Sequence, residues 1–261
     1  MDNIQFQRSA IDASSAFSSA WEQVKSNYGT YLGVSLVAMI MLGCLSCISW
    51  FLMGPVMGGI FYLATKGQRG EPVEFGMMFE GFKKFVPLMV IGLIQAVPGI
   101  VVTVVQTGLN FGRLGVMLSN PEAMRQAQRT GELDGVGAAF SVAFLMLYIG
   151  FMVFSLVWWA VTYFAIPLVM EYDLGPVDAI KLSGRAAFAN IGGLIAVILF
   201  GLLATIIGLL LLCVGVFLVS MPIILVANVI VFWQVFPRQD RGNQYFTPPP
   251  PGTYGFGSPQ Y

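Results

Sequence analysis

Four long runs of this sequence contain no Asp, Glu, Lys or Arg, and they cover residues 30–65, 86–112, 135–170 and 186–237. Only 10% of the 261 residues are charged and 57% are hydrophobic, so a soluble fold would lack the polar exterior that water requires. A helix of about 20 residues crosses the ~30 Å hydrocarbon core of a bilayer, and each run is long enough for that. Helices also satisfy their own backbone hydrogen bonds in lipid. The sequence therefore predicts an all-α integral membrane protein.

The number of crossings depends on the first and last runs. The second and third runs fit one crossing each, and the last is long enough for a hairpin that turns near 213–215. The first run fits two structures. It is either one helix followed by a half-helix that starts at Gly54-Pro55, or a tight hairpin that turns near 46–50.

The positive charges favour a hairpin in the first run. With about six transmembrane helices, both termini lie on one side, and the other side keeps only Arg113, Arg125 and Arg129. The first side then collects Arg8, Lys25, Lys66, Arg69, Lys83, Lys84, Lys181, Arg185, Arg238 and Arg241. Because cytoplasmic loops are enriched in Lys and Arg, we expect both termini to be cytoplasmic. One sizeable outer loop follows, 113–134, with a short surface helix over 121–130.

An amphipathic helix precedes each membrane hairpin in this arrangement. Each begins at an acidic residue, as the helix dipole favours, and its apolar residues recur at helical spacing. Such helices lie in the membrane interface with the apolar face toward lipid. We therefore expect three units of interfacial amphipathic helix plus transmembrane hairpin, 11–65, 73–170 and 177–236.

Composition divides the chain into three regions. Residues 1–29 form an N-terminal cytoplasmic segment, 30–237 the membrane domain, and 238–261 a disordered cytoplasmic tail rich in Pro, Gly and Tyr. Consecutive prolines enforce an extended polyproline II segment, which either is a flexible end or docks in an aromatic-lined groove of a protein partner. The residues predicted to dock are Pro248, Pro249, Pro250, Pro251 and Tyr254.

Polar but uncharged residues inside the runs are the candidates for a binding path. Ionisable residues in a bilayer usually mark ion or substrate paths, and the four runs contain none. Gln95, Gln106 and Asn228 could line a path for a neutral or amphipathic small molecule. Gln95 also precedes Pro98, which breaks the helical hydrogen-bond pattern. The alternative for Gln95 is a helix kink whose amide is satisfied by a neighbouring helix.

Several residue types that enzymes rely on are scarce. The chain has no histidine, and Cys44, Cys47 and Cys213 all lie in apolar runs, where cysteine packs as a small hydrophobe. We therefore expect no metal, no cofactor and no enzymatic activity. Lys plus Arg and Asp plus Glu are equal at 13 each, which gives no field that would attract nucleic acid. Gly54-x-x-x-Gly58 permits close helix packing, within the chain or in a homo-oligomer.

Three short patterns carry a family resemblance. They are Gly54-Pro55 through Gly59, Arg69-Gly70-Glu71 before Phe79-Glu80-Gly81-Phe82, and Ala165-Ile166-Pro167 before 183–190. In these the chain resembles a group of uncharacterised bacterial multi-pass membrane families, including the membrane domain found beside glycerophosphodiester phosphodiesterases. The catalytic domain of that group has no counterpart here, so the resemblance implies a bacterial inner-membrane protein and no activity.

Two functions fit these features. The first is a non-enzymatic protein that organises protein partners or lipid at the cytoplasmic membrane, with the tail as a recruiting segment. The second is a transporter or flippase for neutral or amphipathic small molecules.

Overall fold

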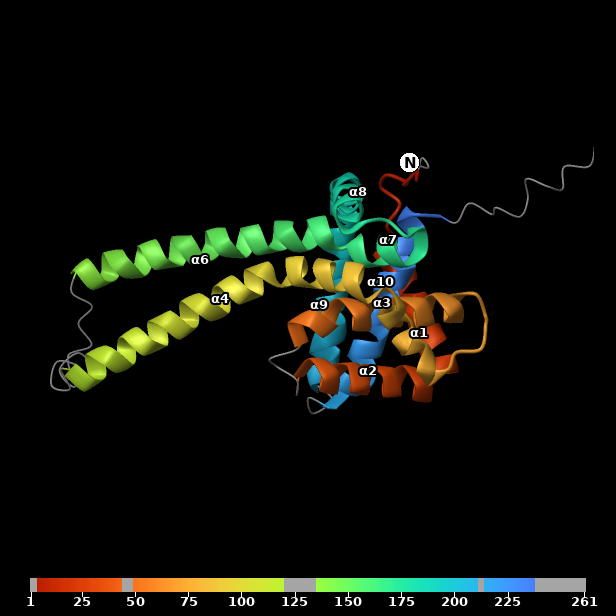
Figure 1. Ribbon diagram of the computed structural model, residues 1–261, viewed down its shortest axis with the longest axis horizontal. Helices are drawn as coiled ribbons and strands as arrows, with labels where there is room; N and C mark the ends of the chain where they lie inside the picture. Colours follow the sequence, from red (N-terminus) through yellow and green to blue (C-terminus); the bar gives the residue numbers. More distant parts are fainter. Residues whose placement is uncertain (1–3, 44–48, 120–134, 211–213, 238–261) are drawn as a thin grey trace, which may run out of the picture.

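The computed structural model describes residues 4–43, 49–119, 135–210 and 214–237, and every regular element in these ranges is a helix. The helices are α1 (Ala13–Ser26), α2 (Tyr28–Gly43), α3 (Ser49–Gln68), the 3-10 helix η1 (Phe75–Lys84), α4 (Phe85–Ser119), α6 (Gly135–Thr162), α7 (Ala165–Tyr172), α8 (Pro176–Ala189), α9 (Ile191–Leu210), the π-helical turn η2 (Val216–Ser220) and α10 (Met221–Val235) (Figure 1). Four stretches are long and apolar enough to cross a membrane: Phe75–Gly108, Leu145–Tyr172, Ile191–Leu210 and Val216–Val235. The all-α prediction is confirmed.

The first apolar run folds as two helices. α3 continues through Gly54 and Pro55, so the alternative in which a half-helix starts there is wrong. α2 packs against α3, and the two lie side by side in Figure 1. α2 is apolar but shorter than a full crossing. The predicted turn near 46–50 lies largely outside the described residues, as do Cys44, Cys47 and Cys213.

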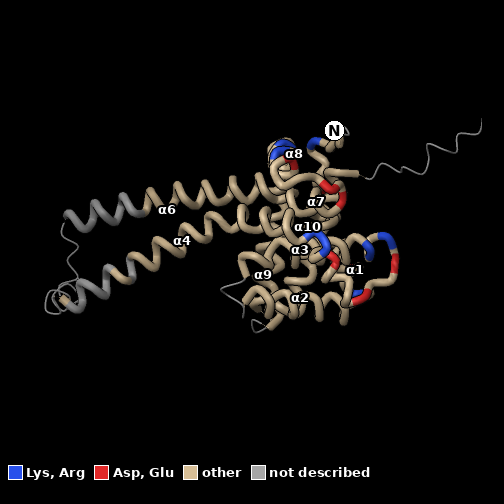
Figure 2. Tube along the Cα trace, in the orientation of Figure 1, with Lys and Arg blue, Asp and Glu red and all other residues tan. Residues whose placement is uncertain are grey.

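A long hairpin of α4 and α6 projects from a body formed by the other helices (Figure 1). The charged residues drawn in Figure 2 gather at the opposite end, around α8, α7, η1 and the end of α3. α4 continues to Ser119, so the outer loop predicted at 113–134 begins later than expected. The rest of this loop, with the helix predicted over 121–130, lies outside the described residues.

Glycines hold α3 close to η1 and to the start of α4. A Cβ added to Gly59 would overlap the backbone of Met78, and one added to Gly81 would overlap that of Pro55. A Cβ on Gly92 would come within 2.7 Å of the Gly54 nitrogen. Of the two glycines predicted to permit close helix packing, Gly54 thus makes a backbone-to-backbone contact within the chain, and a Cβ added to Gly58 would come within 2.7 Å of the Leu88 side chain.

The amphipathic helix α1 packs on other helices through its small apolar residues. Asp12 caps α1 by accepting a hydrogen bond from the Ser15 N–H at 3.1 Å. α1 then lies along α10 and α9 and buries a face of small residues: Ala13, Ala16, Ala20 and Val24. The prediction that the apolar face of this helix lies in lipid is therefore wrong for its alanines and Val24, which pack on protein because small side chains let the helix backbones approach. Trp21, on the same predicted face, remains 46% exposed.

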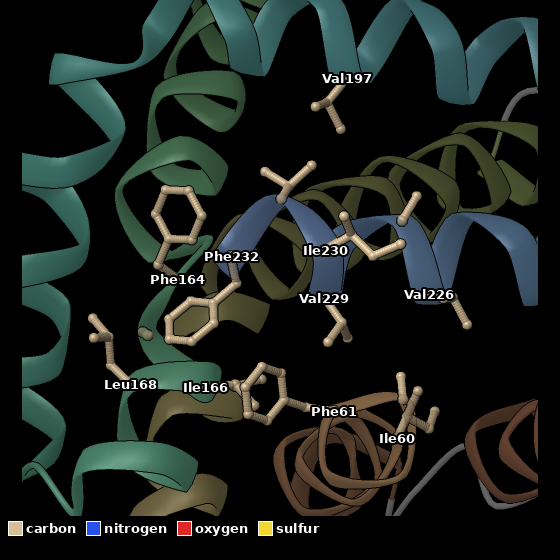
Figure 3. Close-up of a cluster of buried hydrophobic side chains, with 14 of the residues drawn as sticks. Ile60, Phe61, Phe164, Ile166, Leu168, Val197, Val226, Val229, Ile230 and Phe232 are labelled. Atoms are coloured by element: carbon tan, nitrogen blue, oxygen red, sulfur yellow. The ribbon is translucent and has the colours of Figure 1, made fainter. Parts of the chain in front are cut away.

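Aromatic residues fill the core where α3, α7 and α10 meet (Figure 3). The Phe61 and Phe232 rings lie edge to face with centroids 5.2 Å apart, and both are buried. Phe164 is also fully buried, and its ring centroid lies 6.3 Å from that of Phe232. This core forms one wall of the cavity described next.

Candidate functional site

A cavity of about 320 Å³ lies between α3, α4, α6, α7 and α10. Its wall consists mainly of Met, Trp, Phe and aliphatic side chains, with a few uncharged polar groups. The lining residues are Met53, Met57, Ile60, Phe61, Gln95, Pro98, Ser155, Trp158, Trp159, Thr162, Tyr163, Phe164, Ile166, Pro167, Leu225, Asn228 and Val229. Its volume is at the lower end of the range for small-molecule sites, roughly 300–1,000 Å³.

Pro98 determines the hydrogen bonding on the α4 side of the cavity. A helical carbonyl accepts from the N–H four residues later, and Pro98 has none, so the Ile94 carbonyl loses its donor. The indole Nε1 of Trp158 donates to this carbonyl at 2.8 Å. An unpaired carbonyl is costly in an apolar medium, so this bond fixes α6 against α4 at the break.

Gln95 uses one side of its amide to hold the end of α6. Its Nε2 donates to the Thr162 carbonyl at 2.9 Å, and that carbonyl is free because α6 ends at this residue. The chain then turns through Tyr163 and Phe164. At this turn the Phe164 N–H donates to the Ser183 hydroxyl of α8 at 2.9 Å. The alternative in which a neighbouring helix satisfies the Gln95 amide therefore holds for its Nε2 group, which is bonded to α6. It does not account for its Oε1 atom.

Asn228 reaches the cavity from α10. Its Oδ1 accepts a hydrogen bond from the Tyr163 hydroxyl at 2.7 Å, and Tyr163 packs against Trp159 with ring centroids 4.7 Å apart. Neither Gln95 Oε1 nor Asn228 Nδ2 has a hydrogen-bond partner among the described residues. Every fully buried polar side-chain atom in the described part does have one. These two atoms are therefore accessible, and both residues line the cavity.

The described residues that line the cavity include no Asp, Glu, Lys or Arg. Among the residues that the structure describes, no group of three His, Cys, Asp or Glu side chains is placed to hold a metal ion. A charged ligand in this cavity would be buried among apolar side chains without an opposite charge, and burying an unpaired charge is energetically costly. The chemistry of the wall therefore favours a neutral, mostly apolar molecule with one polar group.

The other predicted site residues do not join this cavity. Gln106 lies about three turns further along α4, ~16 Å at 1.5 Å per residue, and its side chain is exposed. The proposed docking residues of the tail, Pro248 to Pro251 and Tyr254, lie outside the described residues.

Sequence reasoning missed the aromatic half of the site. Trp158 and Trp159 lie at the end of α6 and Tyr163 in the turn that follows it, and each lines the cavity. A signal was present, because an indole N–H buried in an apolar run needs an acceptor, and Pro98 creates a free carbonyl.

No protein-family model, no curated protein and no solved structure matches this chain.

Proposed function

We propose that this protein binds a neutral, largely apolar molecule inside the membrane, in the cavity lined by Gln95 and Asn228. The observation that carries the proposal is the meeting of these two residues, from helices far apart in the sequence, in an apolar cavity that has no charged side chain. Gln95 Oε1 can accept a hydrogen bond, and Asn228 Nδ2 can donate one. A hydroxyl group on a hydrocarbon chain satisfies both, so an alcohol-bearing lipid is the class of ligand that fits.

The membrane topology is part of the proposal. We propose six crossings in three units, with both termini on the cytoplasmic side of a bacterial inner membrane; four of the helices are long and apolar enough to span, and the gathering of charge at one end supports this orientation (Figure 2). In that arrangement Gln95, Trp158 and Asn228 lie well inside the apolar layer. A ligand would then enter the cavity from the surrounding lipid. The same site would serve a protein that stores this ligand and one that moves it between the two leaflets.

The first experiment identifies what the cavity retains. The full-length protein is extracted with its membrane lipids into nanodiscs, and native mass spectrometry records the small molecules that stay bound. The test variant is Gln95→Leu with Asn228→Leu, which keeps the volume close and removes both hydrogen-bonding groups. Each lost neutral hydrogen bond is worth about 1 kcal/mol, so the double variant should retain roughly 25-fold less ligand.

Gln106→Leu is the matched control, because it makes the same chemical change on the same helix outside the cavity. We expect it to retain ligand like the parent protein. Equal retention by all three proteins would remove Gln95 and Asn228 from the proposed site. Loss in the control as well would point to a general effect of polar residues on α4.

A second proposal concerns the tail and rests on its sequence. Residues Pro248 to Pro251 with Tyr254 fit a docking segment for an aromatic-lined groove, through which the protein would organise partners at the membrane. Deleting 242–261 should then remove a co-purifying protein while the retained lipid stays the same. An unchanged set of co-purifying proteins would end this proposal and leave the cavity proposal intact.

A further inference from the structure

α8 has two faces of different chemistry. The face toward α6 and α7 consists of small buried residues: Ala179, Ser183, Gly184, Ala186 and Ala187. The opposite face is exposed. At 3.6 residues per turn, its residues follow one another across the helix surface in the order Val177, Phe188, Lys181, Arg185 and Asp178. An apolar edge thus adjoins a pair of cations.

A third basic residue, Arg8, lies on a backbone turn that a buried amide holds at the end of this helix. Asn190, which is 2% exposed, donates from Nδ2 to the Gln7 carbonyl at 2.9 Å and accepts at Oδ1 from the Ala10 N–H at 2.9 Å. Between these two bonds the chain turns at Ser9, which has a φ of 50° and donates to the Ala189 carbonyl at 3.4 Å. Arg8 therefore sits on a clamped turn at the end of α8, next to the turn of helix that carries Arg185.

Among the described residues these three cations have no ion pair, unlike Lys66, Arg69, Lys83 and Lys84 at the same end of the molecule. Lys66 pairs with Glu71 and Lys84 with Asp173. By contrast, within the described ranges Arg8, Lys181 and Arg185 have no acidic partner, and Asp178 on the same face has no basic partner. Three cations against one carboxylate leave a local positive charge that is open to a ligand.

The surroundings indicate which anion fits. Val177 is 62% exposed and Phe188 58% exposed, and both lie on the edge of the face beside the cations. α9 begins directly after Asn190, and its exposed aliphatic side chains, such as Ile195 and Leu199, continue from this corner. A ligand that matches has an anionic headgroup and hydrocarbon chains.

We propose that Arg8, Lys181 and Arg185 bind the headgroup of an anionic membrane lipid whose acyl chains lie along the exposed face of α9. This site is separate from the cavity, since none of its residues lines that space. It does not depend on the cavity ligand. It places α8 at the level of the headgroups and attaches the N-terminal segment to a lipid through Arg8.

The test measures headgroup preference on the full-length protein in a neutral detergent. Dioleoyl phosphatidylglycerol or dioleoyl phosphatidylcholine is titrated in, and native mass spectrometry gives the affinity for the first bound lipid. The parent protein should prefer the anionic lipid. A basic residue near an anionic lipid surface contributes roughly fivefold in affinity, so Arg8→Gln, Lys181→Gln and Arg185→Gln together should remove most of that preference.

Two further variants make the result specific. Lys25→Gln with Lys83→Gln removes two exposed cations from the other amphipathic segments and should leave the preference within about twofold of the parent. Arg8→Lys with Arg185→Lys keeps the charges and should keep most of the preference, which also covers the case in which the triple variant does not fold.

Three results would overturn the proposal. The first is a parent protein that binds both lipids equally. The second is a control pair that loses as much preference as the triple variant, because bulk surface charge would then suffice. The third is displacement of phosphatidylglycerol by inorganic phosphate at an equal concentration, because the site would then recognise a free anion rather than a lipid.

Discussion

The long apolar runs in the body of this molecule and in its projecting hairpin are equally free of charged residues, yet they pack in different ways. In the body, a Cβ on Gly54, Gly59 or Gly81 would overlap the backbone of a neighbouring helix. In the projecting part, nothing lies within 4 Å of a Cβ added to Gly108 or Gly150, and large side chains there are mostly exposed. Hydrophobicity therefore does not distinguish the two regions.

Lipid explains this difference. Hydrocarbon tails are as apolar as leucine, so helices in a membrane gain little from hiding aliphatic side chains from their surroundings. They associate where small residues permit close van der Waals contact and where polar groups need partners. The body has both features, and the outer part of the α4–α6 hairpin leaves its aliphatic surface for lipid to cover.

The largest effect should come from the glycine contact between α3 and η1. Gly59→Ala places a methyl group on the backbone of Met78, which cannot move aside as a side chain would. We expect a loss of about 3 kcal/mol or more in stability, seen as a lower Tm in detergent or as aggregation on size-exclusion chromatography. A variant as stable as the parent would show that η1 does not sit against α3 in this way.

Truncation of large side chains sharpens the comparison at a smaller scale. Leu168, fully buried in α7, and Leu147, 73% exposed in α6, carry the same side chain in the two environments. Leu168→Ala should cost about 2–4 kcal/mol, because it leaves a cavity, whereas Leu147→Ala should change the free energy of unfolding little. Similar losses would mean that the exposed surface of α6 is covered by protein rather than lipid.

A double-mutant cycle tests the hydrogen bond that joins the two helices of the hairpin, α4 and α6, at the Pro98 break. Trp158→Phe removes the donor to the Ile94 carbonyl and should cost about 1 kcal/mol. Pro98→Ala supplies a backbone N–H in its place, so Trp158→Phe should cost less in that background. Thermal unfolding of the four proteins gives the coupling, and strictly additive losses would contradict the assigned partner.

The smallest effect is expected in the outer hairpin. Gly108→Ala meets no neighbouring atom and replaces a helical glycine, so it should be neutral or stabilising by up to about 1 kcal/mol. It is also the matched control for Gly59→Ala. A marked loss of stability would show that α4 makes a close contact at this position, with a second copy of the chain or with another protein.

Local patterns accounted for much of the fold and for part of the site. The acidic helix starts placed α1 and α8 correctly, since Asp12 caps α1 and Asp178 lies in the first turn of α8. Gln95 and Asn228 stood out because they are polar residues in apolar runs. The pattern could not show that they meet at one cavity or that Gln106 lies elsewhere, because periodicity describes a single helix and carries no information on its neighbours.

The sequence by itself determined that the chain is helical and largely apolar, because long charge-free runs in lipid can satisfy their backbone only within helices. It also determined where the helical hydrogen bonding fails, since Pro98 lacks an N–H in any fold. Only the tertiary structure decided that Trp158 supplies the missing donor, that the alanine face of α1 packs on α10, and that Asn190 clamps Arg8 beside α8. These are contacts between distant segments, and close approach and hydrogen-bond partners are properties of pairs of helices rather than of one.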